Sequence, residues 1–260
     1  MWTVWENSAL MMENVYISDP EIPAEFAGFK IAQVSDLHNT EFGNDNSELL
    51  FMLRNAAPDI IAVTGDIIDS AKREDLELVS AFVKQAVQIA PTYYVTGNHE
   101  AHIMDEFRLL ETEMKQAGVH ILHGENEMIQ RGGAAIRVIG IDDPDYYLLS
   151  GSDETVEDSI SKLASKDTFT VMLSHRPELF ETYVENDIDL VLTGHAHGGQ
   201  FRLPFVGGLI APNQGFFPEY DAGLYEERDT HMVVSRGLGN SIIPLRFNNR
   251  PEVVLIELNN

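Results

Sequence analysis

The chain has 260 residues and a formal net charge of −25. Hydrophobic residues make up 44% and charged residues 23%, which is typical of a folded globular protein and excludes an intrinsically disordered one. So acidic a chain lacks the basic face that nonspecific nucleic-acid binding requires, and we expect no nucleic-acid partner. There is no cysteine, which excludes a disulfide framework and a thiolate zinc site. The length predicts a single domain over residues 1–260.

The first half of the chain alternates short apolar strands with amphipathic helices. Ser47 is a plausible N-cap, and the leucines that follow it share one helical face. Strands that end in turns and lead into helices are typical of an α/β protein. The predicted strands cover 15–18, 29–35, 60–64 and 92–96, and the predicted helices cover 47–55, 74–89 and 105–116.

The second half contains more strands and fewer helices. Gly132 and Gly133 predict a hairpin before the strand over 135–141, and 142–153 is predicted to be a loop. The late strands lack long helices between them, which favours antiparallel additions to the sheets and a sandwich over a barrel. Further strands are predicted at 119–122, 168–173, 188–193, 232–235 and 253–258, helices at 154–166 and 177–186, and a Gly- and Pro-rich segment at 198–223.

No apolar run approaches the length of a membrane span. Residues 1–12 contain apolar side chains but lack the basic region and the long apolar stretch of a secretory signal. An anchor absent from this chain would still allow membrane association, so the location stays open between cytoplasmic and membrane-associated.

Four short motifs end on residue types that bind metals, and each follows an apolar strand. Open α/β sheets collect their ligands at the carboxyl ends of strands, so these side chains are expected to meet. Carboxylate, amide and imidazole ligands at this density suit two divalent ions, and phosphate esters are the natural substrates of two-metal hydrolases. The motifs are Asp36-Leu37-His38, Gly65-Asp66, Gly97-Asn98-His99-Glu100 and Gly194-His195-Ala196-His197, with His175 after a further strand.

The motifs differ in specificity when taken singly. Asp-x-His or Gly-Asp alone is more often structural, because such residues also make turns. Gly-Asn-His-Glu and Gly-His-x-His are moderately specific. All four in this order, each at a strand end, indicate a metal centre.

The ordered set resembles the motifs of the calcineurin-like metallophosphoesterases. The stretch from Gly194 through Gln200 and the tail from Ser235 to Glu252 are similar to a bacterial branch that is often membrane-associated. That branch includes phosphodiesterases and a UDP-diacylglucosamine pyrophosphatase. The resemblance implies a four-layer αββα sandwich of two mixed β-sheets flanked by helices. It implies Asp36, His38 and His197 on one metal, Asn98, His175 and His195 on a second, and Asp66 bridging both.

Two further residues are assigned catalytic roles by the same resemblance. His99 is expected to lie beside the metals without binding them and to protonate the leaving oxygen. Asp69 is expected to orient His99 and raise the pKa of its imidazole. Hydroxide formed on two divalent or trivalent ions, with manganese, zinc, iron and nickel as the candidates, would attack phosphorus in line.

Several polar residues have simpler explanations than catalysis. Arg176 could meet a phosphate or form a salt bridge, and Glu100 is expected to be structural. Tyr146 and Tyr147 are expected to pack in their loop. Surface or core packing is the default for His102, His120, His123 and His231.

Three functions compete. The leading hypothesis is a metal-dependent phosphoesterase that cleaves small-molecule phosphodiesters, because few cationic side chains lie near the motifs. The second is a pyrophosphatase acting on a lipid-linked sugar nucleotide, whose acyl chains could lie along Phe205, Leu209, Phe216 and Phe217, although core packing explains these residues as well. The third is an inactive metal-binding scaffold, disfavoured because every expected ligand is present.

Overall fold

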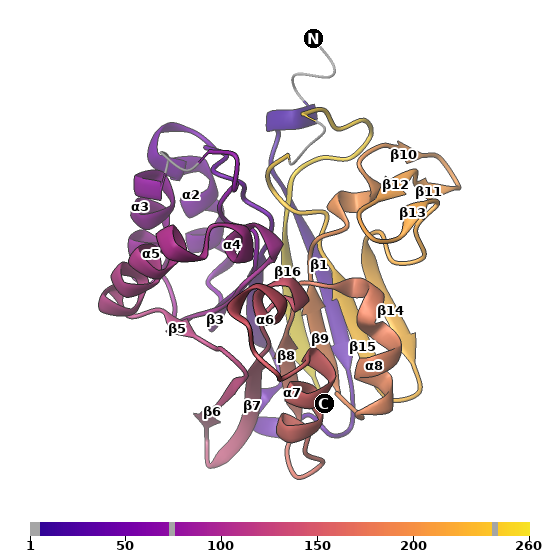
Figure 1. Ribbon diagram of the computed structural model, residues 1–260. Coiled ribbons are helices and arrows are strands. Elements are labelled where there is room, and N and C mark those ends of the chain that lie inside the picture. The colour runs from indigo at the N-terminus through magenta and orange to yellow at the C-terminus, as the bar shows by residue number, and fades with distance from the viewer. Residues whose placement is uncertain (1–5, 73–75, 241–243) are drawn as a thin grey trace.

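The computed structural model describes residues 6–72, 76–240 and 244–260. Two six-stranded mixed sheets pack face to face, and helices cover their outer faces (Figure 1). The predicted αββα sandwich is therefore confirmed.

The first sheet has the order β1-β16-β2-β3-β4-β5. The neighbours β2, β3 and β4 run parallel, so their carboxyl ends lie at one edge. The apolar runs that form them are buried on both sides, as parallel strands require. The strands are β1 (Met11–Ser18), β2 (Phe29–Val34), β3 (Ile60–Thr64), β4 (Thr92–Val95), β5 (His120–Ile121) and β16 (Glu252–Asn259).

The second sheet has the order β14-β15-β9-β8-β7-β6. Its central strands β7, β8, β9 and β15 are parallel, and the outer strands β6 and β14 are antiparallel to their neighbours. The strands are β6 (Glu125–Arg131), β7 (Ala134–Gly140), β8 (Thr170–Leu173), β9 (Leu190–Thr193), β14 (Gly223–Glu227) and β15 (Thr230–Val234).

Three buried layers hold the sandwich together. The middle layer joins the facing sides of the two sheets, with Ile31 and Ile256 from one and Val171 and Leu192 from the other. Helices α2, α3 and α5 cover the outer face of the first sheet, and α7 and α8 cover that of the second. The helices are α2 (Ser47–Ala56), α3 (Leu76–Ala86), α4 (Asn98–His102), α5 (Met104–Ala117), α6 (Pro144–Ser150), α7 (Val156–Leu163) and α8 (Phe180–Glu185).

The prediction of a loop over 142–153 is wrong, because α6 forms there. The side chain of Asp143 caps the helix by accepting a hydrogen bond from the Asp145 N–H, and Pro144 occupies the first turn. Gly151 ends the helix with a φ of 73°. These signals are present in the sequence, but no apolar residue of α6 is fully buried, so its hydrophobic pattern is weak.

Other differences concern strand partners and helix ends. The Gly132-Gly133 hairpin joins β7 to β6, a largely exposed strand absent from the prediction. The late strands are antiparallel additions only in part: β16 is antiparallel to β2, but it is parallel to β1, and β15 is parallel to β9. The predicted helix over 74–89 appears as α3, and its first two residues lie outside the described part of the chain.

The Gly- and Pro-rich segment forms two small hairpins. They contain β10 (Arg202–Leu203) with β11 (Gly207–Gly208), and β12 (Ile210–Ala211) with β13 (Gly215–Phe216). Among the described residues, no helix is both long and apolar enough to cross a bilayer.

Candidate metal centre

Each predicted ligand lies just beyond the carboxyl end of a parallel strand. Asp36 and His38 follow β2, Asp66 follows β3, and Asn98 begins α4 after β4. The facing sheet contributes residues after its own central strands, His175 after β8 and both His195 and His197 after β9. Strand β3 contacts both β8 and β9, so the two sheet edges meet and bring these turns together.

The chain bends sharply at these positions. Five of the predicted ligands have a positive φ, a conformation that is uncommon outside glycine and that concentrates at functional sites. Gly97 and Gly194 allow the loops to approach closely, because a Cβ atom at either would collide with Asp66 or with Ser35 and Asp36. The positive-φ ligands are Asp36 (52°), His38 (47°), Asp66 (51°), His195 (62°) and His197 (48°).

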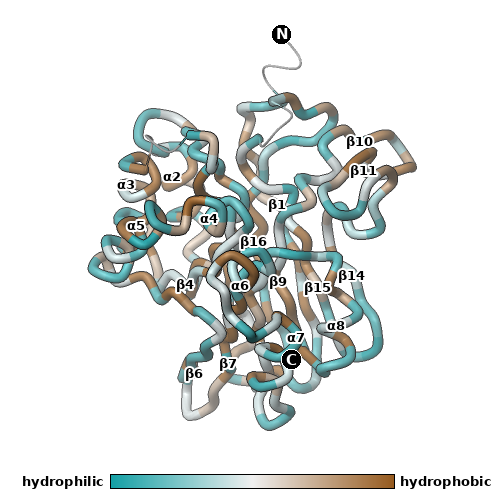
Figure 2. Tube along the Cα trace, viewed as in Figure 1, coloured by the Kyte–Doolittle hydropathy of each residue, from teal (hydrophilic) through white to brown (hydrophobic). Residues whose placement is uncertain are grey.

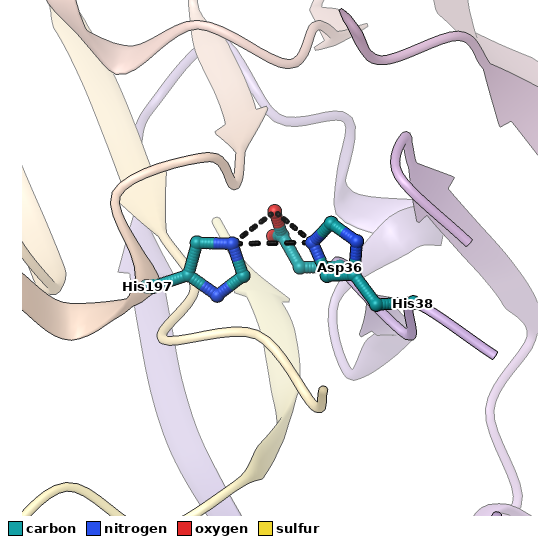
Figure 3. A group of neighbouring side chains, drawn as sticks. All are labelled: Asp36, His38 and His197. Carbon is teal, nitrogen blue, oxygen red and sulfur yellow. Dashed lines mark hydrogen bonds and ion pairs between the residues drawn. The ribbon is translucent and has the colours of Figure 1, made fainter. Parts of the chain in front are cut away.

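The first donor group consists of Asp36, His38 and His197. Figure 3 shows the three side chains pointing toward one another. The Nε2 atoms of His38 and His197 are 3.2 Å apart, and Asp36 Oδ1 lies 3.5 Å from His197 Nε2. The carboxylate of Asp36 is held by the Ser35 hydroxyl at 2.6 Å and by the His195 N–H.

The second donor group consists of Asp66, His175 and His195. His175 Nε2 lies 3.2 Å from Asp66 Oδ2 and 3.2 Å from His195 Nδ1. The same Oδ2 atom of Asp66 is 3.8 Å from His38 Nε2 in the first group. A single carboxylate oxygen therefore faces both groups.

Polar atoms in this centre are positioned to bind cations. Imidazole nitrogens that face each other at 3.2 Å leave little room for protons on both. Asn98 Oδ1 is buried without a hydrogen-bond partner in the described part of the chain, as a ligand oxygen would be. His175 Nδ1 lies 2.7 Å from the carbonyl oxygen of Thr64, which places the Nδ1 proton there and directs Nε2 to the centre. The donor set thus fits two borderline-to-hard divalent ions.

Burial and neighbouring charges set the protonation of these groups. Burial lowers the pKa of His38 to about 3 and lowers the pKa values of His195 and His197, so these imidazoles are neutral and able to bind metal. Burial also acts to lower the pKa of His175, but the Asp66 carboxylate outweighs it and raises that pKa to about 10. A cation between His175 and Asp66 would displace this proton.

His99 lies at the edge of the centre and is partly exposed. Its ring centroid is 4.6 Å from that of His38. The backbone N–H of Ser70 points to His99 Nδ1 at 3.0 Å, so Nδ1 accepts and Nε2 carries the proton. Asp69 Oδ1 is farther from the same nitrogen, at 3.5 Å. Asp69 also accepts a hydrogen bond from the Ala71 N–H, and Lys72 lies 3.3 Å away.

Glu100 has a larger structural role than its sequence position indicates. Its fully buried carboxylate accepts hydrogen bonds from the backbone N–H groups of Gly97 at 2.7 Å, Asp66 at 2.9 Å and Ile67 at 3.0 Å. Burial and the charge of Asp66 raise the pKa of Glu100 to about 7. The side chain thereby ties the loop after β3 to the loop after β4.

Two buried arginines contact ring nitrogens of the candidate ligands His195 and His197. Arg176 Nη2 donates to Asp143 at 2.9 Å, so the salt-bridge interpretation of Arg176 is confirmed. Its Nη1 lies 2.9 Å from His195 Nε2. Because metal binding through Nδ1 places the imidazole proton on Nε2, this contact must loosen when a cation binds.

Arg246 was not identified as a supporting residue from the sequence. It is completely buried and donates to the carbonyl oxygens of Arg236 at 2.7 Å and Gly239 at 2.5 Å. Its Nη2 lies 3.4 Å from His197 Nδ1. An arginine far along the chain from every ligand motif gives no spacing signal, so only the fold reveals this contact.

Comparison with known proteins agrees with this geometry. A model described as "Calcineurin-like phosphoesterase" matches residues 29–199. The chain belongs to the calcineurin-like phosphoesterase family. It is 31% identical to the Bacillus subtilis metallophosphoesterase YkuE over 91% of this chain and 81% of that protein. It is 30% identical to phosphodiesterase YaeI of Escherichia coli, over 89% and 83% of the two chains.

Solved structures share the fold at low identity. A dimetal phosphatase from Danio rerio superimposes with a TM-score of 0.54 at 10% identity, covering 82% of this chain and 88% of that one. As a calcineurin-like phosphoesterase, the protein is a metal-dependent phosphoric ester hydrolase, and an inactive scaffold is not supported.

Proposed function

We propose that this calcineurin-like phosphoesterase hydrolyses phosphodiesters with two metal ions. The observation that carries the proposal is Asp66 Oδ2, which faces both His175 Nε2 at 3.2 Å and His38 Nε2 at 3.8 Å. A carboxylate in that position suits a bridge between two ions. Asp36, His38 and His197 would hold one ion, and Asn98, His175 and His195 the other.

Two ions held there would supply Lewis-acid charge and lower the pKa of water so that it attacks phosphorus. Manganese, zinc, iron and nickel all accept this mixture of imidazole and oxygen ligands. The neutral imidazoles and the two aspartates leave an excess of positive charge when both ions are bound, which attracts an anionic ester into an otherwise acidic protein.

His99 is assigned the transfer of a proton to the leaving group. With Nδ1 occupied by the Ser70 N–H, the proton on Nε2 is available for the leaving oxygen. Asp69, whose Oδ1 lies 3.5 Å from Nδ1, would help to orient the ring.

A diester fits this centre better than a monoester dianion. Arg176 and Arg246, the two buried guanidinium groups beside the histidines, are committed to Asp143 and to backbone carbonyls. Their N–H groups are therefore already engaged, and they offer few donors for a second phosphate oxyanion. A relative that covers most of this chain is also named a phosphodiesterase.

One observation favours the alternative of a pyrophosphatase on a lipid-linked sugar nucleotide. Phe216 and Phe217 are 70% and 63% exposed, so core packing does not account for these two side chains. Exposed aromatic rings near the centre would suit an acylated substrate. Membrane association also remains part of the proposal: a Bos taurus "Transmembrane protein with metallophosphoesterase domain" is 31% identical over 91% of this chain, which spans about half of that protein. We further propose that residues 1–260 act as one domain.

The experiment compares aryl and bis-aryl phosphates with metal-depleted protein. Addition of manganese, zinc, iron or nickel is expected to restore turnover, with the diester cleaved faster than the monoester. Faster monoester turnover would overturn the diester assignment, and absence of turnover with every metal would overturn the hydrolytic proposal. Activity only on an acylated nucleotide would select the lipid-linked alternative.

A further inference from the structure

An exposed apolar surface lies on the small hairpins that follow the last ligand motif. We define the apolar lobe as residues 201–217 together with 245–247. Figure 2 colours parts of the β10–β11 hairpin brown, and Figure 1 places β10 to β13 together at one end of the molecule. Monomeric soluble proteins rarely collect so many exposed apolar side chains. The exposed fractions are 109% for Phe205, 70% for Phe216, 63% for Phe217, 58% for Val206, 46% for Phe247, 41% for Leu245 and 39% for Leu203.

The sequence that forms this lobe is depleted of negative charge. The chain contains 42 acidic residues. None lies between Asp189 and Glu219, and none lies between Asp229 and Glu252. These two stretches supply every residue of the apolar lobe, so the lobe presents a face without acidic residues of its own. Two acids flank it: Glu219, which is exposed, and Asp221, which is 8% exposed and pairs with Arg202 at 3.1 Å. Such a face would approach a phospholipid surface without the electrostatic repulsion that the rest of the protein would experience.

Backbone hydrogen bonds stabilise the hairpins of the lobe. The N–H of Leu209 donates to Phe201 O at 2.8 Å, and that of Phe217 donates to Leu209 O at 2.9 Å. Phe205 and Phe217 have positive φ values of 67° and 56°, which is typical of turn positions. Because these backbone N–H and C=O groups are paired, the aromatic side chains of the hairpins can enter an apolar medium without burying unsatisfied backbone groups.

The lobe adjoins both the metal centre and Glu6. The N–H of Leu209 also lies 3.0 Å from Gly199 O, two residues after His197. The side chain of Asn213, in the turn between β12 and β13, hydrogen-bonds His195. On the other side, Glu6 accepts a hydrogen bond from the Asn248 N–H at 3.1 Å, next to Phe247. A surface in contact with the lobe would therefore be close to the metal centre and to Glu6.

We propose that the apolar lobe docks on the interface of a phospholipid bilayer, with Phe205, Phe216 and Phe217 inserted among the headgroups. Aromatic side chains favour this interface, and the absence of acidic residues fits it. A flat protein partner would leave the protruding tips of the hairpins poorly packed. The inference rests on the membrane association proposed above and assigns the surface responsible for it. It does not depend on the proposed hydrolysis, because docking needs neither metal nor turnover.

The test is co-sedimentation of the full chain with phosphatidylcholine vesicles at low and high salt. The unaltered protein is expected to bind at both salt concentrations, since apolar insertion is not screened by ions. The triple variant Phe205→Ser, Phe216→Ser and Phe217→Ser is expected to partition about 1000-fold more weakly, because each of the three buried aromatic rings contributes roughly tenfold. Phe51→Ser is the matched control: Phe51 is 65% exposed on α2, away from the lobe, and its loss is expected to leave binding unchanged.

Three results would overturn the proposal. The first is failure of the unaltered protein to sediment with vesicles. The second is equal binding by the triple variant, with circular dichroism confirming that it is folded. The third is a dimer of the unaltered protein in analytical ultracentrifugation that the triple substitution converts to monomer, without vesicle binding, which would assign the lobe to contacts between two copies.

Discussion

Two clusters of histidine and carboxylate in this protein look alike in composition and differ in geometry. In the metal centre, imidazole nitrogens face one another at 3.2 Å, and Asp66 Oδ2 faces histidines of both donor groups. At the surface near α5, His123 Nδ1 lies 2.9 Å from Asp142 and its Nε2 lies 3.1 Å from Glu111. In the second cluster each nitrogen has its own acceptor, so the cluster is complete without a cation. Ligand-type residues thus indicate a metal site only where donors converge on one another.

The largest predicted effect separates the two clusters directly. Asp66→Asn removes the charge that faces both donor groups, so turnover is expected to fall by about 1000-fold or more and bound metal to decrease. Asp142→Asn, in the other cluster, is expected to keep both metals and most turnover. Metal analysis and diester hydrolysis check both variants, and equal losses in the two would contradict the distinction.

His99→Ala tests proton donation without ligand loss. Turnover of a diester with a poor leaving group is expected to fall by about 100-fold while metal content is unchanged, because only the proton donor is removed. A good leaving group should show a much smaller decrease. His102→Ala, on the same short helix, is the control. Full turnover of the poor leaving group by His99→Ala would refute the assignment.

Glu100→Gln tests whether a residue that touches no substrate positions the bridging carboxylate. The amide nitrogen cannot accept the backbone N–H groups of Asp66 and Gly97, so metal affinity is expected to fall by about 10- to 100-fold. Titration calorimetry with manganese measures this, and saturating metal should restore much of the turnover. The control is the exposed Glu48→Gln. Unchanged affinity would show that the two loops do not need this carboxylate.

The smallest effect concerns pH and the surface cluster. Burial acts to lower the pKa of His123, but Asp142 and Glu111 outweigh it and raise that pKa above its usual 6.5. A histidine whose pKa is higher in the folded state than in the unfolded state stabilises the folded state. This contribution is fully present below pH about 6.5 and disappears as the pH rises through the folded-state pKa. The free energy of unfolding of the unaltered protein should therefore exceed that of the His123→Gln variant by about 1 kcal/mol near pH 5.5. The difference should be smaller at pH 9. Urea unfolding at both pH values checks this, and a difference that grows with pH would contradict it.

Much of the fold could be predicted because buried strands carry a local signal. Ile60 to Thr64 is continuously apolar and ends directly at Gly65-Asp66, so strand and ligand were recognised together. The edge strand β6 has the opposite character: it is largely exposed, and its pairing with β7 depends on a partner rather than on its own pattern. The helix α6 is not predicted for a similar reason: its capping residues are clear, but none of its side chains is fully buried, so the sequence carries only a weak helical hydrophobic pattern there.

The candidate site also has one part that short sequence motifs predict and another that depends on the fold. Residues such as Asp66 and His195 lie in short motifs, so their types and spacing predict the donor set. The supporting contacts depend on distance in space: Arg246 reaches His197 across 49 positions of sequence, and His175 reaches the carbonyl oxygen of Thr64 across 111. The sequence predicts that Asp69 orients His99, whereas the closer partner of Nδ1 is the backbone N–H of Ser70, which no side-chain motif encodes.

The most direct test is anomalous scattering from crystals of the metal-loaded protein. Two peaks about 3.5–4 Å apart are expected, with the carboxylate of Asp66 between them. A single peak in an active enzyme, or two peaks that Asp66 does not join, would contradict the proposed two-metal centre.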